Sequence, residues 1–489
     1  MNLLVALAAA PIAFLTIAGL LHWPRALSLF GADPRPDRWH TSPTPAFGGI
    51  GIFAGFVAAV TIATAIGPVG IPGDLGIVLA GGAIVFGFGL LDDIIQLHPA
   101  AKLGAQLAAA ALVLQSSISV EFVSSSTLGW ALGMVWIVGL TNAFNLLDNM
   151  DGLAGSLGIV AASCFALSAA FVAPNRDIFL VATGLALALV GFMPYNLRLS
   201  GPARVFMGDS GSQLIGFVLA TLGLMASYKE AGTTVATLVL PILILAVPIL
   251  DTTLVTTLRL RSGRSVTQGG RDHTSHRLVY RGLSERRAVF FLVAVSAALG
   301  LTSLAYAVLD SGRITSIGVL ITFALLLQFA AFLSDVAAAP GERGLSARAG
   351  LLVDTLVDGA LTAASLYAAY VLFIDGNGTP YQRHILVWTL PAVLFCRYVA
   401  LFAFGLYRRD RRYSKSGTVA RIAAAVATSE LVAYLFVTNT QDIGDFPTAI
   451  FLLDAAICFA LLVVGRLAER AGLRAFRSWR RRGTEAAIS

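Results

Sequence analysis

The 489-residue sequence has few charged residues and very few cysteines. Asp, Glu, Lys and Arg make up 12% of it and hydrophobic residues 57%, with a mean hydropathy of +0.80. This composition lies far outside that of soluble globular proteins and indicates a polytopic membrane protein. The three cysteines, Cys164, Cys396 and Cys458, each lie inside an apolar run without CxxC spacing. Their placement argues against disulfides and against a cysteine-based zinc site.

Two other classes are also disfavoured. The first apolar run, "MNLLVALAAAPIAFLTIAGLL", lacks the basic start and small-residue cleavage site of a signal peptide, so we expect it to remain as a membrane span. The net charge of +7 does not indicate nucleic-acid binding, because the basic residues alternate between loops instead of forming one surface.

Long apolar runs predict an all-α fold of many membrane-spanning helices, since a span needs about 20 apolar residues. The candidate spans cover residues 2–21, 46–68, 73–91, 101–117, 129–146, 151–173, 178–196, 211–227, 233–257, 288–309, 313–335, 351–374, 385–406, 419–438 and 447–467. Most of the 34 basic residues lie in alternate loops. The positive-inside rule then predicts an N-terminus outside and a C-terminus in the cytoplasm.

A short segment rich in Ala, Gly and charge, "SDVAAAPGERGLSARAG", separates two sets of spans. We therefore predict a membrane domain over residues 1–335 with about 11 transmembrane helices. A linker over 336–350 and a four-helix membrane bundle over 351–489, with a basic cytoplasmic tail, follow it.

Four polar clusters interrupt the first membrane domain. "LLDDIIQLHPAAKLGAQ" closes the third predicted span, "TNAFNLLDNMDGLAG" closes the fifth, "FMGDSGSQ" opens the eighth, and "GRSVTQGGRDHTSHRLVYRG" follows the ninth. The predicted orientation places all four at the cytoplasmic face. We therefore predict one composite site at the membrane interface.

Asp92 and Asp93 stand at the end of a predicted helix, where the helix dipole disfavours negative charge. Pro99 suits the first turn of the next helix, so Lys102 can reach back toward the two acids. The alternative is a solvated acidic pair at a helix end. That alternative accounts for these two residues alone but not for the other clusters.

Asn142, Asn145, Asp148 and Asp151 recur every three residues. That spacing drifts by about 60° per step on a continuous helix, so the first and last would point in opposite directions. We predict that the helix breaks near Asp148, which lets both carboxylates face one pocket. Simple capping of the next helix accounts for Asp151 only.

"GDSG" resembles a serine-protease motif, but the sequence has neither the all-β pattern nor the partners of a catalytic triad. Asp209 is better explained as a cation ligand at the membrane edge. It stands at a Gly-rich helix start whose free backbone N–H groups suit phosphate.

The loop after the ninth span carries a phosphate-clamping composition. Its candidate residues are Arg264, Asp272, His273, His276 and Arg277. A zinc site fails on ligand count, and a lipid-binding basic loop explains the arginines but not the paired histidines. His40, beside Arg38 in an earlier Pro- and Gly-punctuated loop, is a further candidate.

These residues together suit transfer of a phosphate-linked group to a membrane-embedded acceptor, with Mg²⁺ and basic side chains neutralising the phosphates. A transporter or lipid flippase is the alternative. It predicts acids near mid-membrane instead of at one face.

The ordered motifs "LLDDIIQLHPAAKLGAQ", "NAFNLLDNMDGLAG", "VFMGDSGS", "VPILDTT" and "GRDHTSHRL", with "HTSPTPAFGGI" upstream, resemble the polyprenyl-phosphate N-acetylhexosamine-1-phosphate transferases of bacterial cell-envelope synthesis. The resemblance covers about residues 1 to 335. It implies an enzyme of the bacterial inner membrane that moves a sugar-1-phosphate from a UDP-sugar to undecaprenyl phosphate and releases UMP. It further implies a need for Mg²⁺, with Mn²⁺ as an alternative, and a homodimer.

The resemblance also implies residue roles. Asp92 and Asp93 would activate or orient the lipid phosphate, and Lys102 would bind phosphate. The remaining implied roles are metal binding by Asp209 and Asn145, a nucleotide pocket lined by Asp148 and Asp151, uracil stacking on Phe206, a hydrogen bond from Asn196, and a diphosphate or sugar grip by His273 and His276.

The sequence departs from the family pattern at Ser275, where a His is usual, and at Trp39, where a basic residue is usual. No triple-His loop of the peptidoglycan branch is present, so we expect a UDP-HexNAc such as UDP-GlcNAc, or a deoxy relative, as donor. The last four spans are similar to the membrane bundle that precedes nucleotide-sugar dehydratase domains. We expect them to dock or stabilise, with Asp354, Asp358, Glu430 and Asp454 pairing with basic residues.

Overall fold

The computed structural model describes residues 7–32, 44–66, 73–116, 118, 126–198, 201–229, 240–265, 270–309, 322, 325–326, 329–330, 333, 343–374, 380–407, 415–440 and 447–466. Among these residues, ten helices are long and apolar enough to cross a membrane. The all-α membrane fold is confirmed. The chain forms two compact units, Met1–Asp310 and Ser311–Ser489, and each is described by itself.

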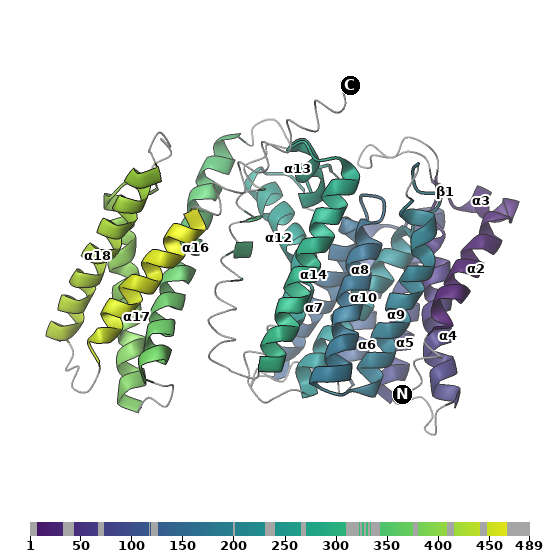
Figure 1. Cartoon of the computed structure of the whole chain (residues 1–489). Coiled ribbons are helices and arrows are strands. Elements are labelled where there is room, and N and C mark those ends of the chain that lie inside the picture. Colours follow the sequence, from purple (N-terminus) through teal and green to yellow (C-terminus); the bar gives the residue numbers. More distant parts are fainter. Residues whose placement is uncertain are drawn as a thin grey trace. The chain divides into compact units, whose positions relative to one another are not determined.

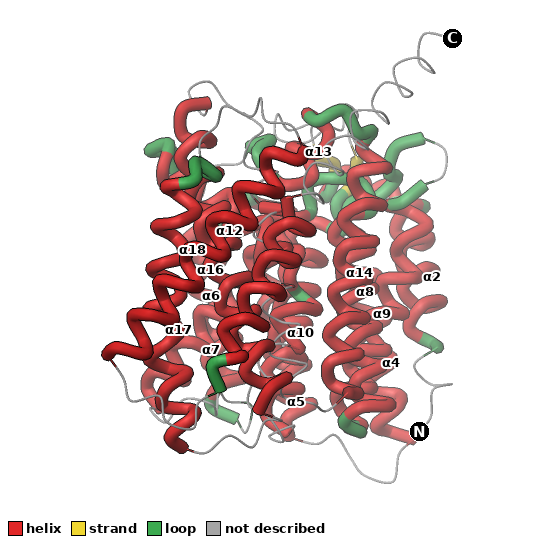
Figure 2. Tube along the Cα trace, turned by 60° about the vertical axis from the view of Figure 1, so that its left-hand side comes forward, coloured by secondary structure: helices red, strands yellow, loops and turns green. Residues whose placement is uncertain are grey.

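In the described residues of the first unit, the regular secondary structure is helical apart from one short strand pair (Figures 1 and 2). Its helices are α2 Ala9–Leu21, α3 Pro24–Leu29, α4 Gly48–Ile66, α5 Gly73–Ile95, α6 Pro99–Leu114, α7 Ser126–Leu147, α8 Leu153–Leu167, the π-helical turn η1 Ser168–Val172, α9 Arg176–Asn196, α10 Gly208–Lys229, α12 Ala246–Arg261, α13 Thr274–Tyr280 and α14 Glu285–Leu309. Strands β1 Gly31–Ala32 and β2 Thr44–Pro45 pair antiparallel. Both views place the strand pair and α13 at the same end of this unit.

Helix α10 is the centre of the first unit. Within its membrane-spanning part, 94% of the residues are buried, against 67% or fewer in the other candidate spans. It packs against α5, α7 and α4. A helix that is apolar all round needs such an enclosed position, so the polar start of α10, "GDSGSQ", is held at a defined place among its neighbours.

Helices occupy most of the predicted spans, and the predicted break near Asp148 is confirmed. Helix α7 ends at Leu147 and α8 begins at Leu153. Between them Gly152 has a φ of 78°, a left-handed conformation that glycine adopts without steric cost. The chain therefore turns between Asn145 and Asp151, as the spacing of the polar residues in this segment predicted.

Two predictions about the spans need correction or lie outside the description. Span 101–117 appears as the 16-residue helix α6, while 233–257 and 313–335 fall partly or mostly outside the described residues. The predicted linker over 336–350 lies partly outside the described residues, and a helix begins within it at Arg343. The division into domains stays a prediction.

The second unit contains α16 Arg343–Ile374, α17 Pro380–Ala403, α18 Lys415–Thr440 and a helix over Ala449–Arg466. Its interior holds a buried ionic cluster beside two apolar clusters. The Arg397 guanidinium lies 2.6 Å from Glu430 Oε2 and 2.9 Å from Asp454 Oδ2, and Arg466 lies 2.7 Å from Asp358. The predicted pairing is confirmed for these three acids, and these contacts join helices of the bundle to one another.

Candidate active site

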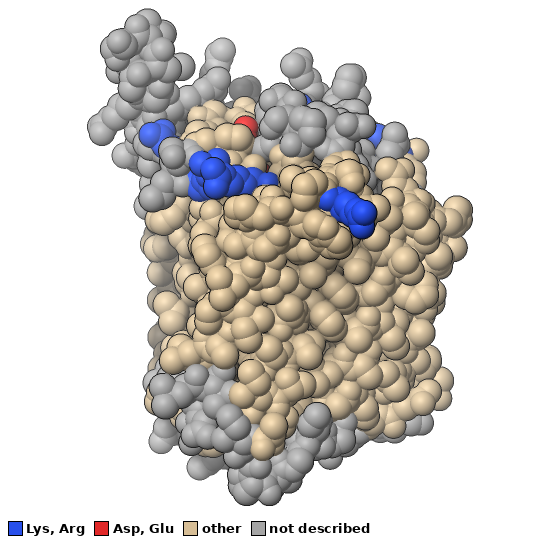
Figure 3. Space-filling view, turned by 90° about the vertical axis from the view of Figure 1, so that its right-hand side faces the viewer, with Lys and Arg blue, Asp and Glu red and all other residues tan. Residues whose placement is uncertain are grey.

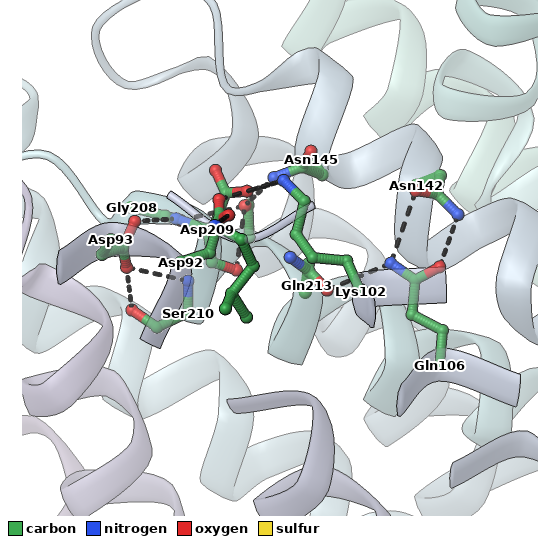
Figure 4. A network of polar contacts seen from close by, with 12 residues as sticks. Asp92, Asp93, Lys102, Gln106, Asn142, Asn145, Gly208, Asp209, Ser210 and Gln213 are labelled. Carbon is green, nitrogen blue, oxygen red and sulfur yellow. Dashed lines mark hydrogen bonds and ion pairs between the residues drawn. The ribbon is translucent and has the colours of Figure 1, made fainter. Parts of the chain in front are cut away.

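Three helix ends bring an acid–lysine cluster together at the start of α10 (Figure 4). Lys102 Nζ on α6 lies 3.0 Å from Asp92 Oδ2 on α5 and 2.8 Å from Asp209 Oδ2 on α10. The side chains of Lys102, Asp92 and Asp209 are 25%, 13% and 16% exposed. The cluster is therefore screened from bulk water yet open to a ligand, and the predicted reach of Lys102 back to the acids is found.

The two adjacent acids of α5 have different tasks. Asp93 accepts hydrogen bonds from the backbone N–H of Asp209 at 2.7 Å and of Ser210 at 3.1 Å, and from the Ser210 hydroxyl at 2.7 Å. A carboxylate at a helix N-terminus satisfies orphan donors and complements the dipole. Asp93 thus positions Asp209, and its predicted role in activating or orienting the lipid phosphate stays a prediction.

Two glycines permit this close approach. Gly208 has a φ of 71°, and a Cβ there would lie 2.5 Å from Asp93 Oδ2. A Cβ on Gly89 would lie 2.7 Å from Ser210 Cα. Real Cβ atoms do not approach so closely, so the contact between α5 and the first turn of α10 depends on both residues lacking a side chain.

An amide network lies next to the cluster. Gln106 Nε2 on α6 donates to Gln213 Oε1 at 3.0 Å, and Asn142 Nδ2 on α7 donates to Gln106 Oε1 at 2.7 Å (Figure 4). Asn145 Nδ2 donates to the Ser212 hydroxyl at 3.0 Å. The bond from Asn142 joins α6 to α7, and the predicted contact of Asn142 with substrate stays a prediction. The sequence signal for Gln106 and Gln213 was their spacing, four residues after Lys102 and Asp209.

The turn between α7 and α8 is tied to the segment before α10. Asp151 accepts from the Ala203 N–H at 2.8 Å. Asn196 accepts from the Gly152 N–H at 2.7 Å and donates to the Val205 carbonyl at 3.1 Å. Because Asn196 is 2% exposed and uses both ends of its amide on the backbone, it holds the loop. Its predicted hydrogen bond to substrate stays a prediction.

Asp148 lies in the same turn, half-buried. Phe206 is largely buried, where it packs with Ala46 and Ala203. Stacking of Phe206 on a base stays a prediction. Of the earlier candidates, His40 lies outside the described residues.

The histidine segment is anchored from α12. His273 Nδ1 lies 2.8 Å from Asp251 Oδ2, and the Thr274 N–H donates to Asp251 Oδ1 at 2.6 Å. His276 is fully buried. Burial, with the nearby His273 adding to it, lowers the pKa of His276 to about 4, so its ring is neutral at pH 7. Asp251 was missed as a site residue because it lies inside an apolar run.

Asp272 joins two arginines beside this segment. It accepts from Arg259 Nε at 2.9 Å and Nη2 at 2.6 Å, and Arg264 lies 3.5 Å away. Burial opposes ionisation of Asp272, but the hydrogen bonds and charge of Arg259 outweigh it and lower the pKa of the carboxyl. Both Asp272 and Arg277 hold this segment together, and their predicted contact with substrate stays a prediction. Asp272 is saturated by Arg259, and Arg277 is completely buried and donates from Nε to the Asp272 carbonyl at 2.7 Å.

Arg264 differs from these buried groups, since its side chain is 34% exposed. Within the described part of the chain no three His, Cys, Asp or Glu side chains are grouped for a metal ion. The cluster around Lys102 offers two carboxylates, Asp92 and Asp209, with the Asn145 amide beside them. Mg²⁺ commonly binds through one or two carboxylates and completes its shell with water and phosphate oxygens, so this oxygen set fits it.

Comparisons with known proteins agree with this arrangement. The sequence profile of glycosyl transferase family 4 matches residues 75–227. A probable undecaprenyl-phosphate N-acetylglucosaminyl 1-phosphate transferase of Bacillus subtilis (strain 168) is 33% identical over 275 residues, which are 54% of this chain and 73% of that protein. A decaprenyl-phosphate N-acetylglucosaminephosphotransferase of Mycobacterium leprae (strain TN) is 30% identical over 296 residues, 53% and 73% of the two chains. A phospho-N-acetylmuramoyl-pentapeptide-transferase of Staphylococcus aureus (strain JH9) is 40% identical over 94 residues, 19% and 28% of the two chains.

Proposed function

This chain belongs to glycosyl transferase family 4, as a phosphoglycosyltransferase of polyprenyl phosphate, and we propose that it transfers HexNAc-1-phosphate from a UDP-sugar to undecaprenyl phosphate. An oxygen of the lipid phosphate attacks the sugar-linked phosphorus. The bond from that phosphorus to the UMP oxygen breaks, and UMP leaves. The product is an undecaprenyl-diphosphate sugar, the starting unit of a cell-envelope glycan.

The observation that supports this proposal most is the Asp92–Lys102–Asp209 cluster. Its ammonium group lies between two carboxylates at 3.0 and 2.8 Å, at a helix start whose N–H groups also favour anions. A phosphate oxygen can take over hydrogen bonds from Lys102, while Asp92, which does not cap α10, is the acid left to orient the acceptor. Arg264, whose side chain is 34% exposed, is proposed to neutralise phosphate charge.

We propose that Asp92, Asp209 and Asn145 hold Mg²⁺. When bound, Mg²⁺ would neutralise the charge of the diphosphate. Mn²⁺ has the same preference for oxygen ligands and is the alternative.

An apolar groove in the same unit suits the isoprenoid chain of the acceptor. It has a volume of about 410 Å³, and its lining includes Leu132, Trp136 and Leu140 of α7, Leu224 of α10 and Ile249 of α12. The α7 residues of the groove lead directly to Asn142 and Asn145. We therefore place the lipid chain along α7, with its phosphate toward Lys102.

UDP-GlcNAc is the proposed donor. It agrees with the names of the two relatives that match over longer stretches, 73% of each relative. The match to the muramoyl-pentapeptide transferase is confined to 28% of that protein. Ser275 stands where the family's His-x-His-His pattern has its middle His, and its hydroxyl donates to Asn149 Oδ1 at 2.8 Å.

We also propose that the site faces the bacterial cytoplasm, with the N-terminus outside and the C-terminus inside. Figure 3 supports this orientation, because the Lys and Arg side chains on the face shown gather toward the end that carries α13, above an uncharged surface of described residues. The positive-inside rule assigns such an end to the cytoplasm. The second unit is proposed to dock or stabilise, and a homodimer is proposed for the whole chain.

The test is UMP release by the purified full chain with undecaprenyl phosphate, Mg²⁺ and a panel of UDP-HexNAc donors. Asp209→Ala should abolish release, whereas Asp177→Ala, an acid in the first turn of α9, should not. Release that needs both lipid and Mg²⁺ supports the proposal and identifies the sugar. No UMP from any donor with folded protein would overturn it and favour the transporter alternative, although Asp92, Asp93 and Asp209 lie at helix ends.

A further inference from the structure

We infer that Asp251 is a positioning residue that fixes the tautomer and ring orientation of His273, so that its Nε2 atom, which then carries no proton, accepts a hydrogen bond from a hydroxyl or amide N–H of the sugar in the sugar nucleotide. The identity of that ligand rests on the proposed function. The geometry of the Asp251–His273 pair is independent of the proposed function.

Both oxygens of Asp251 are engaged with the start of α13. Oδ2 lies 2.8 Å from His273 Nδ1, and Oδ1 accepts from the Thr274 N–H at 2.6 Å. Asp251 is completely buried and His273 is 3% exposed. Since a carboxylate only accepts hydrogen bonds, the proton of the neutral imidazole belongs on Nδ1.

The backbone around His273 is held from several directions, so the ring has little freedom. The Arg277 N–H donates to the His273 carbonyl at 2.9 Å. The Ser275 hydroxyl donates to Asn149 Oδ1 at 2.8 Å. Because Asn149 belongs to the turn between α7 and α8, this bond brings the histidine segment against the turn that carries Asp148 and Asp151.

The opposite nitrogen of the ring is available for a ligand. Over the residues that the structure describes, no protein group hydrogen-bonds to His273 Nε2, and the nearest ring, that of His276, lies edge-on with centroids 6.1 Å apart. A neutral ring with its proton on Nδ1 carries only a lone pair on Nε2, which accepts hydrogen bonds. The ring therefore presents one defined acceptor to a hydroxyl or amide N–H of the sugar nucleotide, as in carboxylate–histidine pairs where the second partner sets the tautomer.

Asp251→Asn tests this arrangement. The amide oxygen can still accept from Thr274, but the amide nitrogen then faces Nδ1 as a donor and forces the ring proton onto Nε2. Nitrogen-15 NMR of histidine-labelled full chain reports the tautomer, with the His273 signal identified by its absence in His273→Gln. We expect Nδ1–H in the wild type and Nε2–H in Asp251→Asn.

Activity supplies the second measurement. UMP release should fall about 100-fold in Asp251→Asn, the usual scale for loss of a partner that orients a histidine. Asp251→Glu should recover part of it. In the His273→Gln background, Asp251→Asn should cost little more, because residues that act as one unit are not additive.

A wild-type His273 with its proton on Nε2 would overturn the inference, whether or not any variant folds. A loss of activity with an unchanged tautomer, or an equal loss in the His273→Gln background, would show that Asp251 is only structural. If the wild type releases no UMP from any donor, the proposed function fails, while the NMR result still decides the geometry of the pair.

Discussion

Replacing Gly89 by Ala should separate α5 from α10 at the point where the acids meet. The new Cβ would lie 2.7 Å from Ser210 Cα and N and 2.8 Å from the Asp209 carbonyl. Carbon atoms in contact need about 3.5 Å, so the first turn of α10 must withdraw by about 0.8 Å. Such overpacking costs about 1–3 kcal/mol in stability. A displacement of about 1 Å at reacting groups can lower the rate about 100-fold.

Gly87 provides the matched control, since a Cβ there meets nothing within 4 Å. Both replacements gain about 1 kcal/mol of helix propensity, so the difference between them isolates the contact with α10. UMP release and thermal unfolding should be measured on both variants. Activity in Gly89→Ala equal to that in Gly87→Ala would refute the view that this contact sets the position of Asp209.

Three further predictions concern charge. Asp272→Asn leaves Arg259 buried without its counter-ion and should destabilise by about 3 kcal/mol at neutral pH. The pKa of Asp272 is lowered in the folded state, so its contribution to stability is complete above the ordinary pKa of about 3.9 and is lost as the pH falls through the lower, folded-state pKa. The melting temperatures of wild type and Asp272→Asn should therefore differ at neutral pH and converge below the folded-state pKa. A difference that stays constant with pH would contradict this. Arg397→Met, which strands Glu430 and Asp454, should destabilise by about 3–5 kcal/mol and Arg397→Lys by less; equal melting temperatures of the three proteins would disprove it. EDTA should stop UMP release and added Mg²⁺ restore it; persistent release in EDTA would exclude the proposed metal.

The helix ends were predictable because local chemistry determines them. Pro99 starts α6, Gly152 allows the turn before α8, and the helix break at Asp148 followed from a spacing that no continuous helix can use. These signals lie within a few residues of their effect. They therefore survive in a single sequence without any knowledge of tertiary contacts.

Hydrogen-bond partners were less predictable because they join residues far apart in the chain. Asp93 and Ser210 are 117 positions apart, and nothing next to Asp93 shows that it caps α10 while Asp92 does not. The sequence predicted that Asn196 binds substrate, because its burial and its two backbone partners, Gly152 and Val205, are visible only in the fold. Asp251 lay in an apolar run, where only its proximity to His273 in the fold gives it a role.

The buried ionic cluster of the second unit has a consequence for biosynthesis. Arg397 is 33 residues ahead of Glu430 and 57 ahead of Asp454 in the chain, so a growing polypeptide presents the cation to the bilayer before either acid is made. A charged side chain at membrane depth is costly without a partner. The α17 segment should therefore remain near the translocation machinery until the final helix emerges, and a ribosome stalled before residue 449 should leave this bundle incompletely inserted.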